Sequence, residues 1–231
     1  MELSIMSAGA AKGLVYALQQ AYTAQTGVVI SGEYGAVGAM KDKLESGKPC
    51  DVIILSEALI ADLARTGQVV AGSSRPLGRV RTGIAVRSGT PQPDISTRAA
   101  FRGNLLAANG IYFPDPERAT AGIHFVSVLR QLGIYDQLLS RLRPYPNGAI
   151  AMQQLAQSRE PLLIGCTQVT EIKYTAGVIL VGLLPKEFEL STVYSAAVCS
   201  RAAQPASARR LVELLSGDAS QAQRNAAGFE T

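Results

Sequence analysis

The chain has 231 residues, 47% hydrophobic and 17% charged, which suits one large domain or two smaller lobes with buried cores. Its formal net charge is +4, but the basic residues are scattered and no Lys/Arg run is interleaved with aromatic residues, so we expect no nucleic-acid partner. Glycine, proline or charge breaks every apolar segment well short of a bilayer span, so we expect no membrane insertion.

The N-terminal part of the chain alternates strand and helix patterns. Apolar runs predict strands at residues 2–7, 28–30 and 51–55. Apolar spacing predicts a helix from about Ala10 to Thr26, another through Met40 and Leu44, and a third after Ser56, which we expect to cap it. The apolar run that ends at Leu55 is continuous, which predicts a strand buried on both faces.

Two longer extended segments, residues 77–86 and 190–198, frame the middle of the chain. Between them we expect a loop at 88–94, a strand from Gly110, helices near 120–132, 148–157 and 167–175, and strands at 161–165 and 178–181. Helices at 206–215 and 219–227 are predicted to close the chain. This alternation is typical of an α/β protein with largely parallel strands.

The extended segments also predict the domain organisation. Strands of this length can pass from one lobe to another, so we predict a two-lobed fold with mixed sheets flanked by helices. Residues 1–82 plus 195–231 would form one lobe and residues 83–194 the other. Helix N-termini and the carboxyl ends of strands would then face a cleft between the lobes.

Four apolar runs end in small residues and then become helical patterns. These junctions lie at residues 7–13, 35–39, 119–122 and 147–150. Small residues let a ligand approach the backbone closely. The N–H groups and the positive dipole end of the following helix favour an anion. Several such junctions in one chain predict a site built mainly from backbone, for a small negatively charged ligand.

Other site chemistries find little support in the sequence. Cys50, Cys166 and Cys199 lack close CxxC spacing and are predicted to be buried free thiols. No Walker loop, nucleophile elbow or His/Cys cluster is present, so the sequence predicts no cofactor and no metal. Strand-like residues directly follow Met1, so we expect a periplasmic location if a leader was removed and a cytoplasmic one otherwise.

Several short motifs occur in an order typical of one protein family. They are the opening strand and small-residue loop at 3–13, Leu-Glu-Ser-Gly-Lys-Pro-Cys-Asp-Val at 44–52, Asp-Pro-Glu at 115–117, Ala-Gly-Ile at 121–123, Leu-Gly-Ile-Tyr-Asp at 132–136, Asn-Gly-Ala-Ile-Ala at 147–151 and Val-Tyr at 193–194. In this order they resemble the molybdate-binding, type II periplasmic binding proteins of ABC importers. The resemblance implies a two-lobed α/β fold that closes on a small anion, a monomer, and an ABC permease as partner.

The resemblance also implies ligand contacts. They fall on Gly9, Ala10, Ala11, Ala36, Val37, Gly38, Gly148, Ala149, Thr167, Gln168 and Tyr194. From the residues themselves, Ser7 is expected to cap the first helix or to contact the ligand. Thr120 is expected to cap its helix or to contact the ligand, and Arg118 is a candidate clamp for a carboxylate.

The resemblance places Gly9 and Val37 where the family carries serines that donate to an oxyanion. Losing such a donor costs roughly 1–3 kcal/mol if the acceptor stays unpaired. We therefore expect an organic carboxylate rather than molybdate, captured by a solute-binding protein without chemistry.

Two other functions remain open from the sequence. One is an isomerase acting on an unsaturated di- or tricarboxylate on the same scaffold, similar to aconitate isomerase. The sequence assigns no catalytic residue to it, and His124, Lys12, Tyr194 or Glu171 could transfer the proton. The other is an effector-binding module of a regulator, which would need a separate DNA-binding partner.

Overall fold

The computed structural model describes residues 1–230 and divides the chain into two compact units. Unit 1 comprises Met1–Val80 and Thr192–Thr231, and unit 2 comprises Arg81–Ser191. The chain leaves unit 1 within strand β4 (Arg75–Arg87) and returns at the start of β9 (Ser191–Val198). The α/β class with mixed sheets flanked by helices, which the sequence predicts, is confirmed.

Unit 1 is built on strands in the order β2-β1-β3-β9. Strand β1 (Glu2–Ala8) runs parallel to β2 (Val29–Gly35) and β3 (Val52–Ser56), and β9 is antiparallel to β3. Its helices are η1 (Gly9–Ala11), α1 (Lys12–Thr26), α2 (Val37–Glu45), α3 (Glu57–Arg65), α9 (Pro205–Ser216), η4 (Asp218–Ser220) and α10 (Gln221–Ala227).

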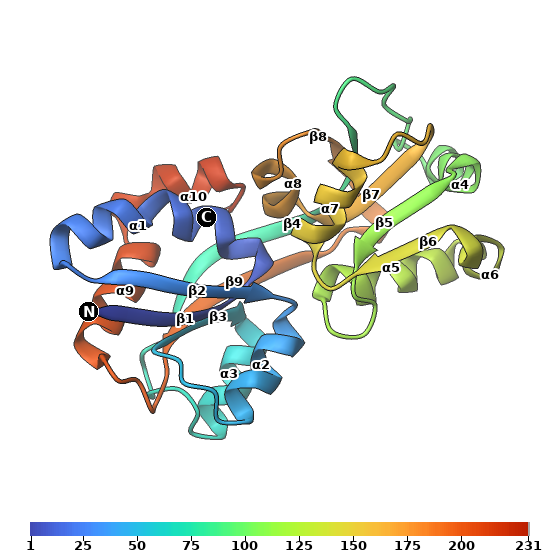
Figure 1. Ribbon diagram of the computed structural model, residues 1–231. Helices are drawn as coiled ribbons and strands as arrows, with labels where there is room; N and C mark the ends of the chain where they lie inside the picture. Colours follow the sequence, from blue (N-terminus) through green and yellow to red (C-terminus); the bar gives the residue numbers. More distant parts are fainter. Residues whose placement is uncertain (231) are drawn as a thin grey trace. The chain divides into compact units, whose positions relative to one another are not determined.

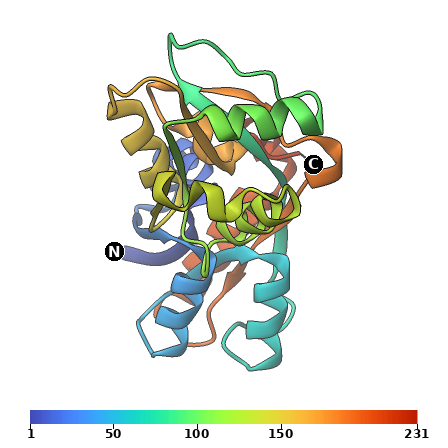
Figure 2. The ribbon, with the colours of Figure 1, turned by 90° about the vertical axis from the view of Figure 1, so that its right-hand side faces the viewer.

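Helices cover both faces of this sheet. Figure 1 shows α1, α9 and α10 on one side and α2 and α3 on the other, and Figure 2 shows α2 and α3 side by side. Every residue of β3 is buried, which confirms the strand predicted to be covered on both faces.

Unit 2 has the strand order β4-β7-β5-β6, with β8 paired to β4. Strand β5 (Gly110–Pro114) is parallel to β6 (Leu142–Tyr145) and β7 (Leu163–Gln168), whereas β4 is antiparallel to β7 and β8 (Val178–Leu183). Its helices are α4 (Arg98–Ala107), α5 (Thr120–Gln131), α6 (Tyr135–Leu138), η2 (Leu139–Arg141), α7 (Gly148–Gln157), α8 (Val169–Tyr174) and η3 (Lys186–Phe188).

The central strands of unit 2 send alternate side chains into two cores. Ile111 and Phe113 of β5 pack in the cluster that also holds buried residues of α4, α5 and α6. Tyr112, between them, packs in a second cluster with Met152 and Leu155 of α7. Strand β7 follows the same alternation, because its Ile164 and Cys166 belong to the α5 side.

Several elements differ from the sequence prediction, among them α4, β2, and the short elements α6 and β6, which the prediction did not contain. The sequence predicted no helix between residues 94 and 110, yet α4 occupies Arg98–Ala107. Thr97 caps it by accepting a hydrogen bond from the Ala100 N–H at 3.1 Å, and Phe101 and Leu105 bury one face. Strand β2 also continues beyond Ile30 to Gly35, because β1 pairs with all seven of its residues.

The three cysteines are buried free thiols, as the sequence predicts. The Cys199 thiol hydrogen-bonds with Cys50, and this bond together with burial raises its pKa. Burial alone raises the pKa of the Cys166 thiol. The thiols of Cys166 and Cys199 are therefore not poised to ionise.

Gly122 fixes how closely α5 approaches the end of β5. A Cβ atom there would lie 2.2 Å from the Asp115 carbonyl oxygen and 2.3 Å from that of Pro114. We expect Gly122→Ala to lower the free energy of unfolding by about 1–3 kcal/mol, because backbone must move. Gly103→Ala on α4 is the control: no atom lies within 4 Å of its Cβ, so a gain of about 0.5–1 kcal/mol is expected. Urea unfolding measures both, and equal effects would contradict the prediction.

Candidate functional site

Strands β1 and β2 end side by side in unit 1. Ala8 pairs with Gly35 in the parallel register, and the chain enters η1 at Gly9 and α2 at Val37. The predicted ligand residues at 9–11 and 36–38 therefore begin two helices at one edge of the sheet. Within residues 1–230 no side chain caps η1 or α2, and neither has an acidic residue in its first turn. Their N-terminal N–H groups are thus suited to an anion.

Tyr194 lies at the same edge of the unit 1 sheet. It pairs with Ser56, the last residue of β3, and its side chain is only 2% exposed. Its ring meets Phe229 edge-on, with centroids 6.5 Å apart. Ser56 precedes α3 without capping it through its side chain, so the cap predicted there is wrong.

Two polar residues next to η1 take different roles. Ser7 is fully buried, and its hydroxyl donates to the Ala8 carbonyl at 2.9 Å, so it does not cap the first helix. Lys12, the first residue of α1, lies over the rings of Tyr16 and Tyr34, with its Nζ 5.4 and 5.6 Å from the two centroids. A cation is therefore held beside the N-terminus of α1, where the helix dipole alone disfavours it.

In unit 2, helix α5 begins without a capping side chain. Its N-cap is Ala119, so the expected cap by Thr120 is wrong, and Thr120 is instead the first helical residue. Asp115 accepts hydrogen bonds from the Glu117 and Arg118 N–H groups and so shapes the preceding turn. The Arg118 side chain is exposed. Like η1 and α2, α5 has no acidic residue in its first turn.

Helix α7 differs, because its N-terminus already holds a carboxylate of the protein. The Ala149 N–H donates to Glu171 Oε1 at 3.2 Å, and the Thr167 hydroxyl donates to Glu171 Oε2 at 2.6 Å. A Cβ on Gly148 would lie 2.0 Å from Glu171 Oε2, so only glycine leaves room. Asn147 caps the helix by accepting from the Ile150 N–H. Three predicted ligand residues, Gly148, Ala149 and Thr167, therefore surround Glu171.

Glu171 is 5% exposed, and burial raises the pKa of its carboxyl group. Hydrogen bonds from the Thr167 hydroxyl and from the Ala149, Gly148 and Gln168 N–H groups act in the opposite direction. Since Gln168 is the N-cap of α8 and Glu171 follows three residues later, this is the reciprocal half of a capping box. The three-residue spacing between Gln168 and Glu171 is visible in the sequence, so the role of Glu171 in capping α8 could have been predicted from it.

His124 is tied to the backbone of its own unit. Its Nε2 lies 2.7 Å from the Phe188 carbonyl oxygen, which only accepts, so Nε2 carries a hydrogen. This bond joins α5 to η3 and gives the histidine a structural role.

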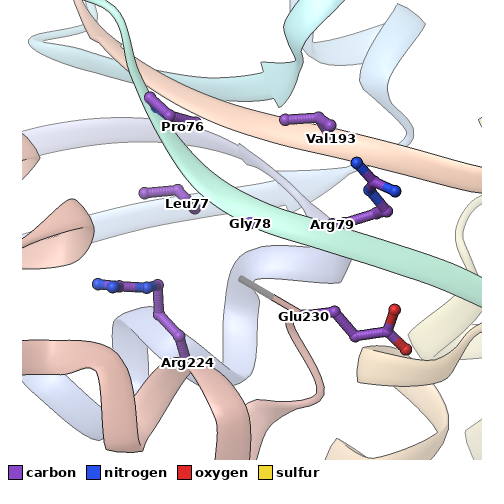
Figure 3. Close-up of a pocket in the computed structure, with 7 residues that line it drawn as sticks. All are labelled: Pro76, Leu77, Gly78, Arg79, Val193, Arg224 and Glu230. Atoms are coloured by element: carbon purple, nitrogen blue, oxygen red, sulfur yellow. The ribbon is translucent and has the colours of Figure 1, made fainter. Parts of the chain in front are cut away.

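Unit 1 also contains a cavity of about 480 Å³ (Figure 3). It is lined by Pro76, Leu77, Gly78, Arg79, Val193, Arg224 and Glu230. None of these is a predicted ligand residue. Arg224 is 5% exposed and donates to the carbonyl groups of Leu215 and Gly217, so it holds the chain between α9 and α10. We therefore place the candidate site at the helix N-termini.

None of the helices in residues 1–230 combines the length and the apolar character that crossing a bilayer requires.

Comparison with known proteins identifies the family. The profile of the family described as "Bacterial extracellular solute-binding protein" matches residues 3–230. An aconitate isomerase of Pseudomonas sp is 31% identical over 232 residues, covering 95% of this chain and 84% of that protein. The molybdate-binding protein ModA of Escherichia coli (strain K12) is 23% identical over 194 residues, covering 82% and 75%. The structure of the periplasmic molybdate-binding protein of Azotobacter vinelandii superimposes with a TM-score of 0.80 at 22% identity, covering 99% of each chain.

These matches confirm the resemblance to molybdate-binding proteins inferred from the sequence. The chain belongs to the bacterial extracellular solute-binding proteins, of the kind to which ModA belongs.

Proposed function

We propose that this protein binds a small organic carboxylate through backbone N–H groups at helix N-termini, without chemistry. As in its family, it would act outside the cytoplasm and deliver the ligand to an ABC permease. The observation that carries the proposal is the contrast among helix N-termini.

The longer helices in residues 1–230 fall into two groups. In one group a side chain of the protein lies at the N-terminus: α3 has Glu57 in its first turn, Thr97 caps α4, and α7 holds Glu171. Helix α9 has neither a side-chain cap nor an early acidic residue, but its first residue is Pro205, which has no N–H group. The N-termini of α1 (entered through η1), α2 and α5 also have neither a side-chain cap nor an early acidic residue. These three coincide with small-residue junctions that the sequence assigned to an anion.

The choice of a carboxylate rests on the side chains at these junctions. Gly9 and Val37 offer no hydroxyl donor to a tetrahedral oxyanion. The backbone N–H groups remain as donors. They suit a planar carboxylate, which accepts hydrogen bonds in fewer directions than a tetrahedral oxyanion does. The room left by glycine and alanine favours a ligand larger than molybdate.

Isothermal titration calorimetry against succinate, malate, tricarballylate, citrate, sulfate, molybdate and tungstate tests the proposal. We expect saturable binding of at least one carboxylate, more tightly than of any tetrahedral oxyanion. Tighter binding of molybdate or sulfate would overturn the choice of ligand. Failure of every anion to bind would overturn the function.

A second candidate is the isomerase, because aconitate isomerase is 31% identical over 95% of this chain. Its reaction would remove a proton from a carbon next to the double bond and return one at the far carbon of the allyl unit, while the double bond shifts. Lys12 and Tyr194 lie at the unit 1 edge, next to the junctions assigned to the anion, and are the candidates for the proton carrier. The ultraviolet absorbance of cis- and trans-aconitate incubated with the protein tests this; an unchanged spectrum contradicts it.

A further inference from the structure

Gln168 carries a buried amide with no partner. It is the last residue of β7 and the N-cap of α8, and its side chain is 2% exposed. Neither its Nε2 nor its Oε1 hydrogen-bonds with any atom of residues 1–230. A primary amide can donate two hydrogen bonds and accept two, and buried polar groups are nearly always paired. An amide left this way points to a group that the protein binds.

Two threonines extend this polar region. Thr82 of β4 lies directly opposite Gln168 in the antiparallel pair and is 1% exposed. Thr170, in the first turn of α8, is 3% exposed. Within the described chain, the hydroxyl of each lacks a hydrogen-bond partner. Since side chains directly opposite in a ladder share one face, Thr82 and Gln168 are neighbours.

The region lies on the face and at the edge where α5 begins. Gln168 follows Cys166 by two residues in β7, so it is on the face that packs against α5. Strands β5 and β7 run parallel, so their carboxyl ends share one edge, and α5 starts just beyond β5. An anion on the N-terminal N–H groups of α5 would therefore have neutral donors and acceptors nearby.

The chemistry of these groups selects a class of ligand. Sulfate and molybdate are bare acceptors at neutral pH and would leave Gln168 Oε1 unpaired. A hydroxyl group both donates and accepts, so it can satisfy Oε1 and Nε2 or a threonine hydroxyl together. Resting on the proposed function, we propose that the ligand is a hydroxycarboxylate whose hydroxyl group is recognised by Gln168, with Thr82 opposite it in the strand pair.

Two matched pairs of acids test this by calorimetry: citrate against tricarballylate and malate against succinate, which differ only in the hydroxyl group. We expect the protein to prefer the hydroxylated member of at least one pair by about tenfold, the value of one buried hydrogen bond. Gln168→Met is expected to weaken that acid about tenfold and leave its partner within about twofold. Thr82→Val should reduce the preference in the same direction while keeping the shape of the side chain.

Gln131→Met is the control, because Gln131 is an exposed residue at the far end of α5 and should leave both affinities unchanged. Thermal unfolding of each variant without ligand confirms that it folds. Equal affinity within both pairs, or equal weakening of both members in Gln168→Met, would overturn the inference while leaving the proposed function intact. If no anion binds at all, both fail.

Discussion

Replacing Glu171 by alanine is expected to lower the free energy of unfolding by about 3–5 kcal/mol. The change leaves the Thr167 hydroxyl and the Ala149 N–H without their acceptor in a buried place and opens a cavity beside Gly148. Urea unfolding gives the size of the loss. Hydrogen exchange of the amides in α7 and α8 shows whether it is local to the two helices that Glu171 joins.

Two comparisons sharpen this prediction. Glu171→Gln keeps the volume of the side chain, but its amide nitrogen would face one of the two donors, the Thr167 hydroxyl or the Ala149 N–H. We therefore expect a smaller loss of unfolding free energy, about 1–3 kcal/mol. Glu117→Ala removes an exposed glutamate of the same unit and should change stability by less than about 0.5 kcal/mol. If Glu171→Ala behaves like Glu117→Ala, the carboxylate does not hold the two helices.

The raised pKa of Glu171 also predicts that the stability of the protein depends on pH. Burial raises the pKa of Glu171, so the folded state binds this proton more tightly than the unfolded state. Its contribution to stability is therefore fully present below the unfolded-state pKa and is lost as pH rises through the folded-state pKa. The stability difference between the native protein and Glu171→Gln should be largest in acid and shrink as pH rises above the ordinary glutamate range. A difference that stays constant or grows with pH would contradict the shift.

Placing an aspartate at Gly38 is expected to weaken anion binding on the order of a hundredfold. Gly38 is the second residue of α2, is partly exposed, and lies in an N-terminus that has neither a side-chain cap nor an acidic residue in its first turn. A carboxylate there would itself occupy the positive end of the helix dipole, and its negative charge would repel an anionic ligand. Because an acidic residue suits a first helical turn, the fold should not lose stability.

The controls separate charge from shape and from position. Gly38→Asn has almost the same size without the charge and should weaken binding far less. Ala206→Asp puts the same charge into the first turn of α9, at an exposed residue outside the proposed site. Calorimetry with the tightest anion of the panel measures all three. If Gly38→Asp and Ala206→Asp bind equally well, the anion does not sit at α2.

Most of the elements could be predicted from the sequence, because their signals are local. Apolar spacing located α1, α5 and α7, and Gly27, with φ of 70°, ends α1 at the predicted place. Helix α4 was missed because only Phe101 and Leu105 mark its buried face, while Gly103 interrupts its middle. Two apolar positions in ten residues are too few to predict an amphipathic helix from periodicity alone.

The residues of the candidate site also fall into those that local sequence features predict and those that only packing brings together. The small-residue junctions at Gly9 and Ala36 are visible in the sequence, because glycine and alanine after an apolar run are local features. The sequence also named Gln168, but it could not show that Thr82 stands opposite it, since that depends on the register between β4 and β7. It could not show that Glu171, 22 residues beyond Ala149, fills the N-terminus of α7.

The sequence by itself therefore determined the α/β class, the family and the junctions that offer backbone N–H groups. Only the tertiary structure decided which of those junctions stay available to a ligand. The physical reason is that hydrophobic periodicity and turn residues act within a few positions of the chain. Whether an N–H group meets a carboxylate of the protein depends instead on residues that packing brings together from distant segments.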